Sequence, residues 1–268
     1  MVQEEGPLLE VKKLEVLYHR VIMAIQGISF RVPRGSIVAL LGINGAGKTT
    51  TLRAISGFMG LDDAQISDGV VEMDGRRLNG KPPHEVARRG VILVPERDKV
   101  FATMTVEENL LAVSARHGAD GACSIRQVYD YFPVLYERRR QVAGYLSGGE
   151  RQMLAIGEAL LCQPRLLLVD ELSLGLAPTI VSHLMETLLA LKQELGIALL
   201  VVEQNALAAL KIADYCYIME NGRIVFEGTP ERLLGHEDVQ EFYLGLSEKG
   251  LKSYREVRQY RRTRRWWG

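Results

Sequence analysis

The chain alternates between short apolar runs and longer stretches in which apolar residues recur at helical spacing. The apolar runs are residues 37–41, 91–94, 166–169 and 197–202. Such runs are typical of strands buried on both faces of a sheet. Helical patterns follow at residues 48–56, 150–161, 178–195 and 205–212. This alternation predicts an α/β protein with a mostly parallel sheet covered by helices.

Three regions depart from this alternation. Residues 8–18 and 28–32 are rich in strand formers, and residues 70–75 indicate a hairpin turning at an Asp-Gly pair, so antiparallel strands are expected near the N-terminus. A second hairpin is expected at Asn221-Gly222. From about 96 to 160 the pattern is largely helical, with short helices expected at 124–131 and 135–141 and a capping box at residues 105–108. We interpret this region as an inserted helical subdomain.

A glycine-rich segment, GINGAGKT at residues 42–49, links the first buried strand to a helix. It matches G-x-x-x-x-G-K-[ST], and its strand–loop–helix context argues against a chance match. Small residues let backbone amides face phosphate oxygens, the lysine adds a full charge, and the threonine hydroxyl is a Mg²⁺ ligand. The segment predicts a site for ATP. The expected contacts are Gly42, Asn44, Gly45, Ala46, Gly47, Lys48, Thr49 and Thr50.

Two acids end the buried strand at residues 166–169. Asp170 is expected in the Mg²⁺ shell together with Thr49, and Glu171 is expected to polarise the attacking water. Two surface acids capping a buried strand are the plainer alternative. The phosphate loop in the same chain favours the metal-binding and catalytic roles over that alternative.

Residues 146–150 read LSGGE and lie between the phosphate loop and the acidic strand. Together these motifs resemble the ABC ATPases, over about residues 8–243. A capping box explains Ser147 and Glu150 but not the two glycines between them, which carry an entropic cost. The resemblance implies that Ser147, Gly148 and Gly149 contact the γ-phosphate of ATP held by a second ATPase subunit. It also implies a P-loop NTPase (RecA-like) core within residues 1–247.

Other positions take expected roles from the same resemblance. Tyr18 corresponds to the aromatic residue that stacks on adenine, although a core tyrosine is an alternative. Residues 173–177 correspond to a segment that crosses the dimer interface. Glu96, at the entrance of the helical insertion, lies in the region that receives helices from two transmembrane permease subunits.

Several positions differ from most of the family. Glu96 replaces a glutamine and Gln204 a histidine, while Leu172 and Glu158 replace a proline and an arginine. The pair Glu96 and Gln204 resembles the ATP-binding subunits of branched-chain amino acid importers and their urea and amide relatives. That branch implies a heterodimer with a different ATPase subunit, a homodimer being the alternative for the isolated chain. A substrate-binding protein would take part indirectly.

Composition adds three constraints. Hydrophobic residues make up 47% of the 268 residues, the formal net charge is zero, and three scattered cysteines fit a reducing compartment. The acidic N-terminus does not resemble a signal peptide, and no apolar run is long enough to span a bilayer. We therefore expect a cytoplasmic protein held on the inner face of the cell membrane by its partners.

The C-terminal residues 248–268 form a basic tail with eight Lys/Arg and two Asp/Glu, and two tryptophans precede the final glycine. Contact with anionic lipid and a solvated or packed tail are both compatible with this pattern. No nucleic-acid-binding motif accompanies the charge.

Two alternatives to a transporter subunit remain for the chain as a whole. One is a soluble ABC ATPase, and the other is a weakly hydrolytic regulatory ATPase.

Overall fold

The computed structural model describes residues 6–96, 100–114, 123–236 and 239–240. The basic tail predicted at 248–268 lies outside the described residues. Among the described residues, no helix combines the length and the apolar character that a bilayer crossing requires.

The larger sheet has six strands in the order β10-β9-β3-β8-β7-β6. They are β3 (Ile37–Gly42), β6 (Val91–Val94), β7 (Leu166–Asp170), β8 (Ala198–Glu203), β9 (Tyr215–Glu220) and β10 (Arg223–Gly228). All neighbours pair in parallel except β10, which forms the predicted hairpin with β9. The carboxyl ends of β3, β7 and β8 therefore meet at one edge, where ligands of α/β proteins bind.

Both faces of this sheet are buried, which explains the uninterrupted apolar runs. Leu199 and Val201 of β8 belong to one apolar cluster, whereas Leu200 and Val202 belong to another on the opposite face. Each cluster packs against different elements, so the central strands are fixed from both sides.

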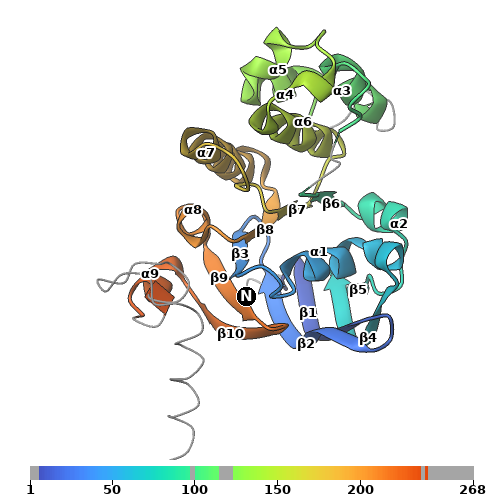
Figure 1. The fold of residues 1–268 in the computed structure, drawn as a ribbon, viewed down its shortest axis with the longest axis vertical. Coiled ribbons are helices and arrows are strands. Elements are labelled where there is room, and N and C mark those ends of the chain that lie inside the picture. Colours follow the sequence, from blue (N-terminus) through green and yellow to red (C-terminus); the bar gives the residue numbers. More distant parts are fainter. Residues whose placement is uncertain (1–5, 97–99, 115–122, 237–238, 241–268) are drawn as a thin grey trace, which may run out of the picture.

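The smaller sheet is antiparallel, with strands in the order β2-β1-β4-β5. They are β1 (Leu9–Tyr18), β2 (Ile22–Val32), β4 (Ala64–Met73) and β5 (Arg76–Arg77). The helix α1 (Lys48–Ser56) lies beside this sheet (Figure 1). One apolar cluster contains side chains of both sheets and of α1, so the phosphate-loop helix is buried between them.

Four helices form a group apart from the two sheets, at the top of Figure 1. They are α3 (Val106–Ser114), α4 (Ile125–Tyr131), α5 (Pro133–Glu137) and α6 (Gly148–Leu161), with the short turn η2 (Ala143–Tyr145) before α6. The helix α7 (Pro178–Leu195) packs on the same apolar cluster. The remaining helices are η1 (Phe58–Asp62), α2 (Pro83–Arg88), α8 (Ala206–Leu210) and α9 (Pro230–Leu234).

The predicted fold class is confirmed, and the differences concern element ends. The strand β2 begins at Ile22 rather than 28, and β4 at Ala64 rather than 70. Both extensions carry exposed residues because one face of this sheet is open, which interrupts the apolar pattern. The helix predicted at 135–141 is α5 (Pro133–Glu137), which begins at Pro133 because proline fits the first turn of a helix and which ends at Glu137, before a turn at residues 138–140.

Candidate nucleotide site

The phosphate loop connects β3 to α1, and two of its glycines have left-handed backbone. Gly45 has φ +80° and Gly47 has φ +104°, conformations that other residues rarely adopt. A Cβ on Gly42 would lie 2.5 Å from the carbonyl oxygen of Met219. These positions therefore need glycine for reasons of backbone angle and space.

The helix α1 begins directly after this loop, and its N-terminus can bind an anion. Gly47 caps the helix without any side-chain hydrogen bond, and the first turn contains no acidic residue. The first amides of a helix have no partner within the helix, and the helix dipole makes that end positive. The arrangement can bind phosphate oxygens.

Lys48 is held at the bottom of the site by three oxygens. Its Nζ atom donates to the carbonyl oxygens of Gly42 at 2.8 Å and Ile43 at 3.2 Å. It also forms an ion pair with Glu171, with Nζ and Oε1 3.0 Å apart. The two side chains are only 4% and 8% exposed, so this charge pair is shielded from water.

The acidic pair ends β7 directly opposite α1. Thr49 donates its hydroxyl to Asp170 Oδ1 at 3.1 Å. The pKa of Asp170 is raised to about 6, chiefly by burial and also by the nearby carboxylates of Glu171 and Glu96, while the Thr49 hydrogen bond and the Lys48 charge oppose the shift. A hydroxyl and a carboxylate beside a phosphate loop are oxygen donors of the kind Mg²⁺ prefers, so these two residues fit the metal.

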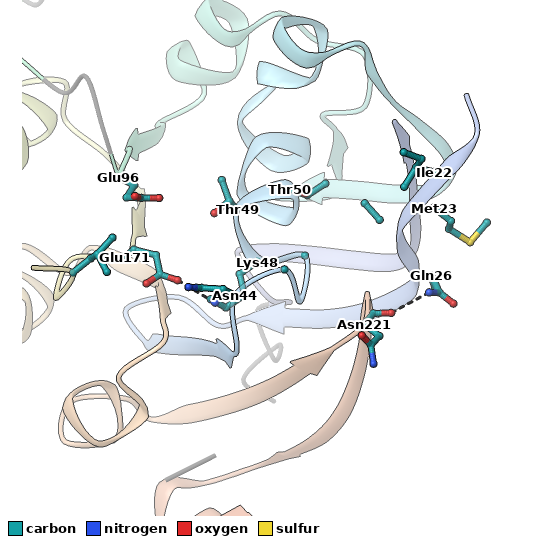
Figure 2. Close-up of a pocket in the computed structure, with 14 residues that line it drawn as sticks. Ile22, Met23, Gln26, Asn44, Lys48, Thr49, Thr50, Glu96, Glu171 and Asn221 are labelled. Carbon is teal, nitrogen blue, oxygen red and sulfur yellow. Dashed lines mark hydrogen bonds and ion pairs between the residues drawn. The ribbon is translucent and has the colours of Figure 1, made fainter. Parts of the chain in front are cut away.

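A cavity of about 670 Å³ is lined by half of the predicted site residues (Figure 2). The predicted residues that line it are Asn44, Gly45, Gly47, Lys48, Thr49, Thr50, Glu96 and Glu171. Glu96 and Glu171 lie on one side, and Ile22 and Met23 on the other. The apolar pair and Asn221 were missed by sequence reasoning; the exposure of Ile22 and Met23 becomes visible only in the folded hairpin.

Five predicted residues outside the LSGGE segment do not line the cavity: Gly42, Ala46, Tyr18, Asp170 and Gln204. Gly42 and Ala46 support the loop instead: Gly42 accepts from Lys48, and Ala46 is buried. The hydroxyl of Tyr18 lies 3.1 Å from Thr50 Oγ1, so the tyrosine contacts α1 without lining the cavity. Gln204, which follows β8, is exposed and also lies outside the lining.

The LSGGE segment at residues 146–150, the signature, lies at the N-terminus of α6 and away from the cavity. Ser147 accepts from the Glu150 amide at 3.2 Å, and Glu150 accepts from the Ser147 amide at 2.8 Å, which is the predicted capping box. Arg138 forms an ion pair with Glu150 at 2.5 Å. Gly148 and Gly149 open α6, and none of these residues lines the cavity of the same chain.

Glu203 at the end of β8 is a buried carboxylate that sequence reasoning did not single out. Its pKa is raised by burial, against hydrogen bonds from Ser173 and Leu172. The sequence does not mark Glu203 as special, because a polar residue at the end of an apolar run is what any strand end would show.

The fold and this site define a P-loop protein that binds a nucleoside triphosphate. The family model described as ABC transporter matches residues 25–173. The chain is 43% identical over 229 residues to the high-affinity branched-chain amino acid transport ATP-binding protein BraG of Pseudomonas aeruginosa, covering 85% of this chain and 96% of BraG. It is 37% identical to the probable branched-chain amino acid transport ATP-binding protein LivF of Archaeoglobus fulgidus, covering 80% and 89% of the two chains.

Solved structures agree with this assignment. The ADP conformation of MJ1267, an ATP-binding cassette of an ABC transporter, superposes with a TM-score of 0.77 at 26% identity, covering 90% of this chain and 99% of the other. The chain therefore belongs to the ATP-binding proteins of the ABC transporter family, and it is an ATPase. The predicted resemblance is confirmed.

Proposed function

We propose that this chain binds and hydrolyses ATP to power an importer of branched-chain amino acids or related small amino acids, amides or urea. The observation that carries the substrate class is the similarity to BraG over 96% of that protein's length. The cavity around Lys48 and Glu171 supports the ATPase role.

We propose the following role for each residue of the site. The amides of residues 44–49 and Lys48 bind the triphosphate. Ile22 and Met23, which line the cavity, face the base, and Tyr18 joins them only on closure. Thr49 and Asp170 hold Mg²⁺, which when bound offsets phosphate charge. Lys48 exchanges Glu171 for phosphate oxygens, which frees the carboxylate to orient water and accept its proton. Glu96 faces the same region of the cavity, and Gln204 approaches only on closure.

The signature supports a two-subunit site. Ser147, Gly148 and Gly149 lie outside the cavity of their own chain, so they are available to a second subunit. The helix α6 presents its positive end there. We propose that they seal ATP held by a different ATPase subunit, and that a homodimer forms when that subunit is absent.

The helical group offers a surface for membrane partners. Phe101, Met104 and Tyr145 are exposed apolar side chains beside the signature, and backbone hydrogen bonds join their segments, from Gly144 to Ala102 and from Ala143 to Met104. We propose that two permease subunits dock here, near Glu96, and hold the chain on the cytoplasmic face of the membrane. A substrate-binding protein delivers the cargo on the other side.

Uptake by cells tests the substrate class. Cells that lack this chain, complemented with the wild type or with Lys48→Ala, are supplied with labelled leucine, urea or a short amide. Leucine uptake should depend on the wild-type chain. Uptake of urea or amide alone would move the proposal to that substrate, and unchanged uptake of all three would contradict it.

A further inference from the structure

Glu203 lies where the functional strand ends meet, yet it does not touch the cavity. It is the last residue of β8 and pairs with Leu41 of β3, while its neighbour Val202 pairs with Asp170 of β7. Its side chain is fully buried. A carboxylate buried this deeply requires donors that offset the loss of water.

Those donors come from the loop that follows the acidic pair, Asp170 and Glu171. The Ser173 amide donates to Glu203 Oε1 at 2.9 Å, and the Ser173 hydroxyl donates to Oε2 at 2.5 Å. The Leu172 amide donates as well. In the described part of the chain, the hydrogen bonds of this carboxylate all go to these two residues, so its charge is stabilised by the loop itself.

The loop begins with an unusual backbone conformation at Glu171. Its φ of +48° is left-handed, a conformation that residues with a side chain rarely adopt. The Glu171 amide donates to the carbonyl oxygen of Val202 at 2.9 Å. The left-handed turn also directs the next two amides at Glu203. Two groups at the end of β8 therefore hold the turn by accepting hydrogen bonds: the Val202 carbonyl and the Glu203 carboxylate.

We propose that Glu203 is a positioning residue that fixes the backbone turn at Glu171 and thereby the direction of its carboxylate. This inference rests on the role proposed for Glu171 above. Glu203 acts through hydrogen bonds to Leu172 and Ser173 and touches neither nucleotide nor water in the cavity. Lys48 and Thr49 make no hydrogen bond to Glu203, and a misdirected Glu171 competes less for Lys48, so loss of the Glu203 carboxylate should not weaken nucleotide binding.

Steady-state kinetics on the full-length chain without its second ATPase subunit test this role, because every site of the proposed homodimer depends on the Glu171 of this chain. Glu203→Gln should lower kcat about ten-fold or more while KM for Mg-ATP stays within about two-fold, because only the transition-state arrangement is lost. Ser173→Ala should cost less, and adding it to Glu203→Gln should change little further, since both act on one contact. Glu227→Gln, an exposed acid on β10, serves as the control and should leave kcat unchanged.

Hydrogen exchange provides a readout that needs no activity. In Glu203→Gln, a peptide covering residues 172–176 should exchange faster than in the wild type, while a peptide covering the phosphate loop should not change. Wild-type kcat in Glu203→Gln, or a joint loss of kcat and Mg-ATP binding, would overturn the proposal. If the wild type hydrolyses no ATP, the proposed function fails, and the exchange result alone decides for or against the positioning role.

Discussion

The Nζ atom of Lys48 lies 3.0 Å from Oε1 of Glu171, joining the phosphate loop to the acidic strand through a buried ion pair. The residue proposed to bind phosphate thus neutralises the residue proposed to activate water. A triphosphate competes with the carboxylate for the same ammonium group. Binding of the substrate and release of the base are therefore coupled by one side chain.

Replacing Glu171 with Gln removes the proposed base while keeping the size and shape of the side chain. Gln204 cannot carry a proton where most relatives have a histidine, so we expect the partner subunit's site to be the more active one. The assembled transporter with Glu171→Gln should then keep substantial transport. Ser147→Ala is the matched variant, because it alters the signature that serves the partner's site, and it should lower transport more. Uptake measured with both variants checks this order. Complete loss with Glu171→Gln and little loss with Ser147→Ala would reverse the assignment.

Gly149 has no room for a side chain. A Cβ there would lie 2.7 Å from Cγ2 of Ile180, whereas a Cβ on Gly148 would lie 3.2 Å from Cδ2 of Leu176. Gly149→Ala should lower the free energy of unfolding by about 1–3 kcal/mol, as overpacking does, and Gly148→Ala should lower it less. Urea denaturation measures both. Equal stability of the two variants would show that Ile180 moves aside without cost.

Glu158 in α6 is half-buried, and its buried Oε1 atom has no hydrogen-bond partner in the described part of the chain. Burial raises its pKa from 4.5 to about 8. Because the folded-state pKa is the higher one, the protonated form favours folding; this contribution is complete below pH 4.5 and is lost as pH rises through about 8. At pH 7, Glu158→Gln should be more stable than the wild type by about 1–3 kcal/mol.

Urea denaturation of both proteins at several pH values checks this sign. The advantage of Glu158→Gln should grow from pH 5 to pH 9 and vanish near pH 4. Glu227→Gln provides the exposed control, with no comparable dependence. A constant difference across this range would show that Glu158 does not titrate as its burial implies.

The basic tail at 248–268 is tested by removing it. A full-length chain should co-sediment with vesicles containing anionic lipid more than a chain ending at Ser247 does, and added salt should reduce the difference. Vesicles of neutral lipid serve as the control. Equal sedimentation of the two chains would exclude the lipid contact.

Local sequence predicted the parts of the site that depend on a continuous segment. The phosphate loop, the acidic strand end and the capping box at Ser147 each need residues at fixed spacing, and each is present in the structure. Ile22 and Met23 were not found, because their place beside the loop is set by pairing between β1 and β2. Glu203 was missed for the same reason, since its donors are 30 residues away at Ser173.

The central claim is that the loop at residues 42–49 binds a triphosphate through Lys48. Isothermal titration calorimetry of Mg-ATP into the full-length chain measures this directly. The wild type should bind, Lys81→Ala at an exposed lysine should bind equally well, and Lys48→Ala should bind at least about ten-fold more weakly, because a buried charge-assisted contact is removed. Equal affinity of the wild type and Lys48→Ala, or no binding by a folded wild type, would contradict the account.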